Sequence, residues 1–306
     1  MCRWWLTFTL VVGLQVQATD TLTVTFTGDV LLDRGVRVKI STDGVESLFS
    51  PSVDSLFAHS DVVVGNLECP VTDIRTPMQK MYIFRGDPEC LSVLRQHGFT
   101  HLNMANNHTV DQGRRGLRDT WQNVRRAGMV PVGAGENMAE ASRPVLLASA
   151  PREVWLIASL RMSLENFPFL KDRPCVSQLP FDSLVTQVQR LRAEKPRAVI
   201  VVSLHWGAEH TLKPVPQQRQ QARRLVDAGA DLLVCHHTHT LQTVEEYRGK
   251  RIYYSIGNFI FDPSQPVNRQ ACVVRLNVTA DDLSVETLPV TIDNCTPRLQ
   301  GETRME

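Results

Sequence analysis

Three histidines fall within four residues in the last third of the chain: His236, His237 and His239. The apolar run at residues 232–235 predicts a short buried strand that would fix the imidazoles following it. In an extended segment, His237 and His239 share one face, whereas His236 points to the other side. Because imidazole nitrogen is a common ligand of transition metals, the cluster predicts a metal site. Ordinary hydrogen-bonded histidines are the alternative.

Two more residues of the ligand type follow predicted strands elsewhere in the chain. Residues 198–204 are a continuous apolar run, typical of a buried parallel strand, and His205 ends it. Residues 22–26 are rich in β-branched side chains, and the chain then reaches Gly28 and Asp29. Open α/β sheets place their sites at the carboxyl ends of strands. We therefore expect His205 and Asp29 to bind a metal, although Gly-Asp pairs also form simple turns.

A third strand end carries an amide and a carboxylate. Residues 61–64 predict a strand, and Asn66 and Glu68 follow it two positions apart, so that both can face the same side. Helix capping is the alternative, and Pro70 makes that role less natural. Glu68 and Asn66 are therefore candidate oxygen ligands.

A fourth strand end combines an amide with a histidine. Residues 100–105 predict the strand, and Asn107 can offer its side-chain oxygen to a metal. His108, the next residue, can donate a proton or stabilise an anion. Asp111 follows closely enough to orient the His108 ring. We predict Asn107 as a ligand, and His108 and Asp111 as catalytic residues.

The composition is that of an ordinary globular enzyme. The chain has 306 residues, of which 42% are hydrophobic and 21% are charged. Its net charge of +1 provides no general attraction for nucleic acid, and we expect no nucleic-acid partner. An anionic ligand must therefore be held by a local site.

The elements needed to position these side chains alternate along the sequence. Amphipathic spacing predicts helices over residues 181–192 and 216–228, between the predicted strands. Residues 244–256 predict a hairpin. Residues 272–276 and 283–292 alternate with the period of antiparallel strands, and we expect them to close a second sheet. The pattern indicates a mixed α/β fold.

Residues 1–18 predict a signal peptide. Arg3 precedes an apolar run of roughly 12 residues, shorter than the ~20 needed to cross a bilayer, and a small-residue pattern follows at residues 16–18. We expect an exported protein, periplasmic or extracellular, or a membrane-anchored one if the leader is retained. An oxidising compartment would permit disulfides among the six remaining cysteines, but the sequence does not reveal their pairing.

An ordered set of motifs covers residues 23–262: TGDVLLDRG, GNLECPVT, FRGDPE, ANNHTVDQGRRGL, SLHWGAEH, DAGADLLVCHHTHTLQTVE and YYSIGNFIFD. This set resembles the bacterial capsule-synthesis CapA (PGA_cap) proteins, which are linked to poly-γ-glutamate production within the calcineurin-like metallophosphatase superfamily. The resemblance implies a four-layer α/β/β/α sandwich of two packed mixed sheets. The expected domain spans residues 22–295, and residues 296–306 would form a tail.

The resemblance also assigns roles to residues at the predicted strand ends. Glu68 matches the bridging carboxylate, with Asn66 as the second choice, and His108 matches the catalytic histidine. Leu31 stands where the superfamily often has a histidine, so the first metal would lose one ligand. Cys235 replaces the glycine before the histidines, which removes no ligand. The remaining matches are metal ligands: Asp29, Asn107, His205, His237 and His239.

The resemblance implies a metal-dependent hydrolase of phosphoesters, with one or two divalent transition metal ions, Mn, Fe or Zn, in capsule or poly-γ-glutamate biosynthesis. The implied partners are an anionic polymer or phosphoester substrate and a membrane-bound polymer synthase complex. Two alternatives remain open. The chain could bind or assemble polymer without catalysis, using a vestigial phosphatase pocket, or it could hold a purely structural metal.

Overall fold

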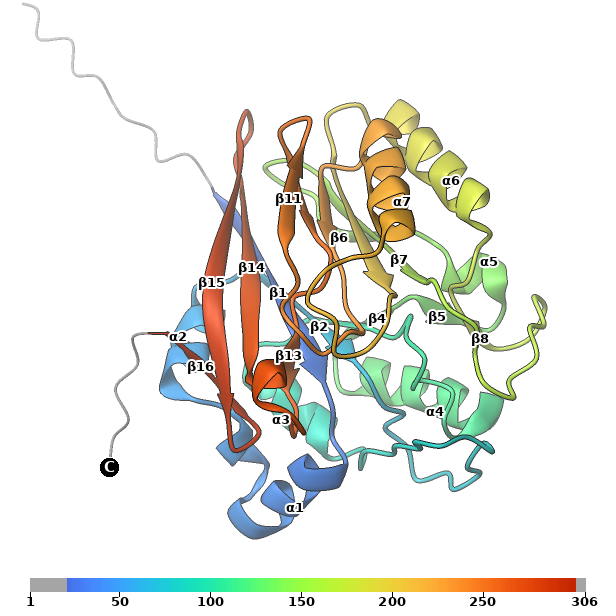
Figure 1. Cartoon of the computed structure of the whole chain (residues 1–306), viewed down its shortest axis with the longest axis vertical. Helices are drawn as coiled ribbons and strands as arrows, with labels where there is room; N and C mark the ends of the chain where they lie inside the picture. Colours follow the sequence, from blue (N-terminus) through green and yellow to red (C-terminus); the bar gives the residue numbers. More distant parts are fainter. Residues whose placement is uncertain (1–20, 301–306) are drawn as a thin grey trace, which may run out of the picture.

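Two packed β-sheets form the centre of the fold in the computed structural model, which describes residues 21–300 (Figure 1). Within these residues, the first sheet has the spatial order β16 (Thr296–Leu299), β15 (Leu283–Asp293), β14 (Gln270–Val278), β1 (Leu22–Val30), β2 (Val62–Leu67), β3 (His101–Asn103) and β4 (Val130–Val132), with β13 (Asn258–Ile260) also pairing β1. The second sheet has the order β11 (Val244–Tyr247), β12 (Lys250–Tyr253), β10 (Leu232–Val234), β9 (Val199–His205), β7 (Val154–Leu160) and β6 (Val145–Ala148). A small separate pair joins β5 (Ala134–Gly135) and β8 (Cys175–Val176).

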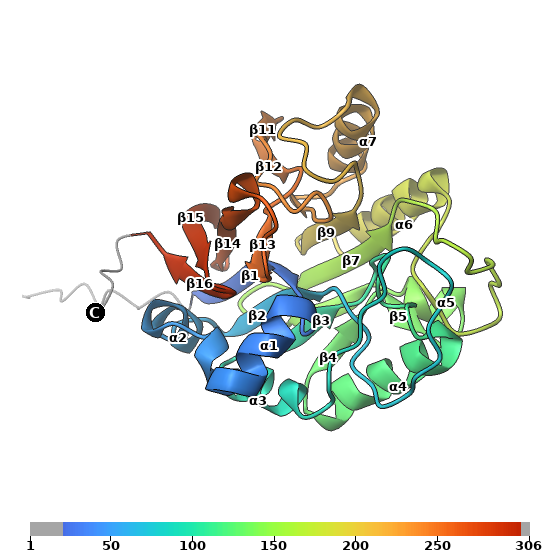
Figure 2. The same cartoon turned by 60° about the horizontal axis from the view of Figure 1, so that its bottom comes forward.

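Helices cover the outer faces of both sheets. They are α1 (Arg34–Asp43), α2 (Pro51–Ala58), α3 (Cys90–Gln96), α4 (Gly113–Arg126), α5 (Met138–Ala141), α6 (Phe181–Glu194) and α7 (Pro216–Asp227), with 3₁₀ turns η1 (Val45–Leu48) and η2 (Pro266–Arg269). Figure 2 shows α1, α3 and α4 on one side of the sheets, and α6 and α7 on the other. None of the helices in the described residues is both long and apolar enough to cross a membrane.

Three hydrophobic clusters hold these layers together. The central cluster joins Phe26 and Val64 of the first sheet to Leu156 and Val201 of the second. A second cluster packs α1 to α4 against the first sheet, and a third packs α6 and α7 against the other sheet. Burial of apolar side chains between layers is the main stabilising term in such a fold. The four-layer α/β/β/α sandwich expected from the sequence is confirmed.

Parallel pairing gathers the strand ends that the sequence singled out. Asp29 of β1 lies opposite Asn66 of β2, and His205 of β9 bridges to His236 just after β10. The close approach of residues 257 and 258 to β1 at this edge requires Gly28, because a Cβ at that position would lie 2.2 Å from the carbonyl oxygen of Gly257. The chain after β12 can therefore pass directly beside the end of β1.

The C-terminal strands differ from the prediction. β14 and β15 do not close a second sheet; β14 pairs antiparallel with β1 along residues 22–26 and extends the first sheet. Alternating polarity predicts a strand with one buried face but does not identify its neighbour. The sheet also continues through β16, beyond the boundary predicted at residue 295.

Two other sequence predictions concern the leader and the cysteines. The predicted signal peptide, residues 1–18, lies outside the described residues. The cysteines within the described range are all buried and unpaired: Cys69, Cys90, Cys175, Cys235, Cys272 and Cys295. In this part of the chain they pack as small apolar side chains.

His97, at the end of α3, ties together segments that cover the first sheet, and its charge should make stability depend on pH. Its ring stacks on Phe49 at 3.7 Å, and its nitrogens contact Glu46 and Asp54. Burial lowers the pKa of His97, but the hydrogen bonds to both carboxylates outweigh burial and raise it. The stabilisation is therefore fully present below the ordinary histidine pKa of about 6.5 and is lost as pH rises through the folded-state value.

We expect the difference in Tm between wild type and His97→Gln to be largest slightly below neutral pH and to shrink in alkaline buffer. Thermal unfolding followed by circular dichroism across this range measures the difference. His59→Gln, a change at another histidine on the same side of the fold, is the control. A difference that stays constant with pH contradicts the assignment.

Candidate metal centre

Strand ends from both sheets bring the predicted site residues to one region. Asp29 and Glu68 come from the β1 and β2 ends, and His205 comes from the end of β9. Asn66 lies within β2, and the other residues lie in the segments that follow β3 and β10. The nine predicted residues are buried, except that Asn107 is half-buried: Asp29, Asn66, Glu68, Asn107, His108, Asp111, His205, His237 and His239.

Glu68 is shared between two groups of ligand-type side chains. One group is Asp29, Glu68 and His239, and the other is Glu68, His205 and His237. Within each group, one ligand atom from each residue lies within 4.8 Å of the others. Glu68 Oε1 lies 3.4 Å from His205 Nε2 and 3.9 Å from His239 Nε2. The arrangement could hold one or two cations, with the Glu68 carboxylate between them.

Several buried polar atoms at this centre have no hydrogen-bond partner. They include both carboxylate oxygens of Glu68 and Oδ2 of Asp29, although His239 Nδ1 lies 3.3 Å from that Oδ2. A buried charge without a compensating partner is strongly unfavourable. Carboxylate oxygens combined with imidazole nitrogens are a donor set that suits Mn, Fe or Zn. The residues therefore fit a divalent transition metal.

The ionisation of the centre shows how strongly it favours positive charge. Burial raises the pKa of Glu68 well above its usual value, and the charge of Asp29 adds to this effect. Burial also acts to raise the pKa of Asp29, but the neighbouring imidazoles of His236 and His239 hold it well below its usual range. The pKa of His239 rises to about 10 because Glu68 and Asp29 outweigh its burial. The proton held by His239 offsets negative charge in this group, and a cation bound by the same ring would displace it.

The two imidazoles of the second group, in contrast to His239, have lowered pKa values. Burial, together with the charge of His239, lowers the pKa of His237 to about 4. Burial also lowers the pKa of His205 well below its usual value, and neighbouring His237 adds to the shift. Neutral imidazole is the form that binds a metal. His205 and His237 are therefore in the ligand form at neutral pH.

The sequence pattern predicted that His236 would point away from the site, but in the structure it points toward it. Its Nδ1 lies 3.2 Å from Asp29 Oδ1. The prediction assumed an extended backbone, but φ is +99° at His237 and +56° at His239. These left-handed conformations are uncommon for residues other than glycine and interrupt the alternation of a strand. His236 is consequently a second imidazole beside the first group, next to His239.

The two predicted amide ligands lie differently. Asn66 Nδ2 donates to Asp29 Oδ1 at 2.8 Å, and its Oδ1 accepts from Asn106 Nδ2 at 3.3 Å. Both polar atoms of Asn66 are thus occupied in orienting neighbours, and its position favours support of Asp29. Asn107 Oδ1 instead lies 2.7 Å from His205 Nε2, at the edge of the second group. That oxygen remains a candidate ligand.

His108 is held by a buried ion network that includes a residue the sequence analysis missed. His108 Nδ1 lies 2.8 Å from Asp111 Oδ2, and the backbone N–H of Phe84 donates to the same oxygen at 2.8 Å. Lys80 Nζ donates to Asp111 Oδ1 at 2.7 Å and to the Asn107 carbonyl at 3.1 Å. Burial lowers the pKa of His108 against the opposing effect of Asp111. Lys80 sits in an irregular segment without periodicity, so only its charge distinguished it in the sequence.

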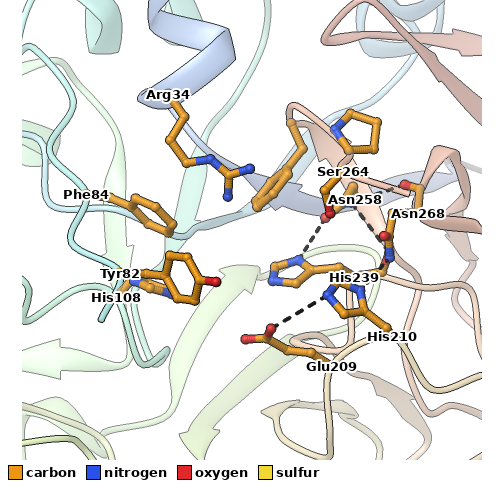
Figure 3. Close-up of a pocket in the computed structure, with 12 residues that line it drawn as sticks. Arg34, Tyr82, Phe84, His108, Glu209, His210, His239, Asn258, Ser264 and Asn268 are labelled. Atoms are coloured by element: carbon orange, nitrogen blue, oxygen red, sulfur yellow. Dashed lines mark hydrogen bonds and ion pairs between the residues drawn. The ribbon is translucent and has the colours of Figure 1, made fainter. Parts of the chain in front are cut away.

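A pocket opens onto this centre, with His108 and His239 in its wall (Figure 3). Its volume is about 150 Å³, below the ~300–1,000 Å³ of pockets that enclose whole drug-sized ligands. It therefore has room for one small group of a larger ligand.

Arg34, which the sequence analysis also missed, reaches into the pocket from the start of α1, across from His239 (Figure 3). The guanidinium lies 5.7 Å from the Phe84 ring centroid and 5.9 Å from that of Phe261. Its Nε pairs with Asp262 at 3.1 Å, whereas its two terminal nitrogens have no partner among the described residues. These nitrogens can bind an anionic group, since guanidinium matches carboxylate and phosphate geometry. The φ of +55° at Arg34 is an uncommon conformation of the kind found at functional sites.

Comparison with known proteins decides the family. Residues 23–263 match the family described as bacterial capsule synthesis protein PGA_cap. The chain belongs to this family. It is 33% identical over 282 residues to the PGA biosynthesis protein CapA of Bacillus subtilis (strain 168), covering 91% of this chain and 73% of that protein. It is 30% identical to the capsule biosynthesis protein CapA of Bacillus anthracis, covering 91% of this chain and 69% of that protein.

A further relative and one solved structure extend the comparison. This PGA_cap chain is 31% identical over 218 residues to a protein of Mycobacterium tuberculosis named "probable polyglutamine synthesis accessory protein", covering 66% of this chain and 56% of that protein. The fold is similar to that of the NAD nucleotidase of Haemophilus influenzae, with a TM-score of 0.51 and 11% identity, over 90% of this chain and 56% of that chain. At this identity the similarity shows a common fold.

Glu68→Gln tests whether the shared carboxylate of the PGA_cap chain holds metal. We expect saturating Mn²⁺ or Zn²⁺ to stabilise the wild type by on the order of 3 kcal/mol at roughly 100 times Kd, and Glu68→Gln by much less, because the variant loses a charged ligand common to both groups. Metal-dependent Tm shifts and bound metal by mass spectrometry measure the effect. Glu153→Gln, at a half-buried carboxylate that pairs with Lys195 outside both groups, is the control. Equal metal content in Glu68→Gln and wild type would falsify the site.

Proposed function

We propose that this PGA_cap protein is an exported, metal-dependent hydrolase of phosphoesters or a related bond that acts in capsule or poly-γ-glutamate biosynthesis. The observation that carries the proposal is the buried Glu68 carboxylate, shared by two ligand groups and without a hydrogen-bond partner on either oxygen. Membership of the capsule synthesis family supports the biological context. Export and a membrane-bound polymer synthase partner belong to the same proposal, and the apolar leader pattern supports export.

The site residues would have separate duties. Asp29, Glu68 and His239 would hold one cation, and His205 and His237, with the Asn107 oxygen, would hold a second that shares Glu68. One or two ions of Mn, Fe or Zn would supply a Lewis acid and lower the pKa of bound water.

The missing histidine of the superfamily pattern bears on the number of ions. Leu31 is fully buried among apolar side chains, so it contributes no ligand to the first group. His236 lies beside Asp29 and offers another imidazole there. A single ion in the complete second group remains the alternative stoichiometry, which quantitative metal analysis distinguishes.

His108 would act in proton transfer at the reacting bond. Its Nδ1 is engaged by Asp111, so its Nε2 is the atom available to substrate. Fixing one ring nitrogen sets the tautomer and the orientation of the imidazole. With Lys80 and the Phe84 N–H holding Asp111, the Asp111 carboxylate favours the doubly protonated form of His108. In that form, the proton on Nε2 can pass to a leaving oxygen or stabilise its charge.

Alanine substitution at two histidines tests the activity. We expect His108→Ala to lower kcat on an aryl phosphate with added metal by roughly 10²- to 10⁴-fold, the usual contribution of a general acid or base. His237→Ala should lower both the activity and the bound metal. His59→Ala, at an exposed histidine outside the site, is the matched control. Activity that persists in both site variants would remove the hydrolase assignment and favour a polymer-binding or assembly role.

Arg34→Gln tests anion binding in the pocket. We expect KM for an aryl phosphate to rise on the order of tenfold because a charge-assisted hydrogen bond is lost, with a smaller change in kcat. Arg197→Gln is the control, since Arg197 is an exposed arginine outside the pocket. Steady-state kinetics at fixed metal concentration separate the two parameters. An unchanged KM in Arg34→Gln contradicts the proposed contact.

A further inference from the structure

A second hollow lies along the outer face of α4, away from the ligand groups. Besides residues of α4, its lining includes Ile74 and, from a later segment, Leu170, Arg173 and Pro174, and it has a volume of about 470 Å³. We call this hollow the α4 groove. No residue of the α4 groove lines the pocket beside His239.

The α4 groove carries a concentrated positive charge. Its lining includes four arginines and one carboxylate, Asp119, in a chain whose net charge is only +1: Arg114, Arg115, Arg118 and Arg173. Asp119 Oδ2 is engaged by the Thr72 hydroxyl and by Asn123 Nδ2. The groove therefore has an excess of positive charge that its own carboxylate does not offset.

Two of these arginines are free to bind a ligand. Arg115 and Arg173 are exposed, and neither side chain has a hydrogen-bond or ion-pair partner among residues 21–300. Arg118 instead pairs with Glu136. Unpaired guanidinium groups at a groove are available for bidentate contacts with carboxylates.

Arg114 lines the groove, and none of its contacts neutralises its positive charge. Its Nη1 donates to the Pro174 carbonyl at 2.6 Å, Nη2 donates to the Pro168 carbonyl, and the guanidinium lies 4.1 Å from the Phe167 ring centroid. All these partners are neutral. Burial, with a smaller contribution from the charge of Arg173, lowers the pKa of the Arg114 guanidinium. Arg114 and Arg173 both line the groove, so an anion lying in it can contact both positive charges.

Two segments of the chain are common to the groove and the candidate centre. α4 begins at Gly113, two residues after Asp111, which orients His108. The segment that contributes Ile74 continues to Lys80 and Phe84, both of which bond to Asp111. The groove and the Asp111–His108 pair are therefore built on the same two segments of the chain.

We propose that the α4 groove binds an extended polycarboxylate chain, a polymer of the poly-γ-glutamate type. This assignment deepens the proposed function and rests on its polymer context. Carboxylate is favoured over nucleic acid because single-stranded nucleic-acid sites pair basic grooves with stacking aromatic rings, and the groove lining contains no aromatic side chain. The regular spacing of charge along such a polymer allows several arginines to be used at once.

Fluorescence anisotropy of the full chain with labelled poly-γ-glutamate tests the proposal. We expect Arg115→Glu combined with Arg173→Glu to weaken binding by on the order of tenfold or more, because like charges then face the polymer. The neutral pair Arg115→Gln and Arg173→Gln should give an intermediate loss. Binding should weaken with added salt, since exposed charges are screened. Arg190→Glu on α6 is the matched control, an exposed helical arginine with the same change of charge outside the groove.

Each outcome separates this inference from the hydrolase assignment. Absence of wild-type binding, or equal losses in the groove variants and Arg190→Glu, overturns the groove. Binding of polyphosphate or a single-stranded oligonucleotide in preference to poly-γ-glutamate overturns the choice of ligand. The anisotropy measurement needs no turnover, so polymer binding in a protein that hydrolyses no aryl phosphate would refute the hydrolase and support the groove. Circular dichroism of every variant verifies its fold.

Discussion

Two buried carboxylates held close together are the constraint on which the rest of the structure depends. Asp29 and Glu68 are fully excluded from water, and three of their oxygens in total lack an ordinary partner. Removing such groups from water costs several kcal/mol each unless positive charge compensates them. In the protein alone, His239 provides that charge. The fold thus tolerates an unfavourable pair of buried acidic groups at the candidate site, which is typical of functional sites.

The sandwich architecture makes this arrangement possible. Each sheet contributes strand ends, and neither could form both ligand groups alone, because Asp29 and Glu68 belong to the first sheet and His205 to the second. The apolar cluster between the sheets holds these ends together. Packing in the core therefore determines distances at the centre, and changes in the core far from the metal ligands can alter its geometry.

Parts of this organisation could be predicted from the sequence, and others could not. Asp29, Glu68 and His205 were predictable because each ends an apolar run, and parallel strands gather their carboxyl ends. The position of His236 was not, since a positive φ at His237 has no signature in a run of histidines. Lys80 and Arg34 come from an irregular segment and a strand-to-helix turn, where no period indicates direction. Alternation identified β14 and β15 as strands but left their pairing with β1 undetermined, because pairing depends on which edge is open.

The Asp111 carboxylate has a consequence for motion around the site. It receives Lys80 Nζ and the Phe84 N–H from one segment and His108 from another. If residues 80–84 move away, the Asp111 carboxylate loses its hydrogen bonds from Lys80 and Phe84. Of these three partners, His108 alone then remains. The loop and the histidine ring therefore form one cooperative unit, and slow amide exchange in the loop should accompany a rigid imidazole.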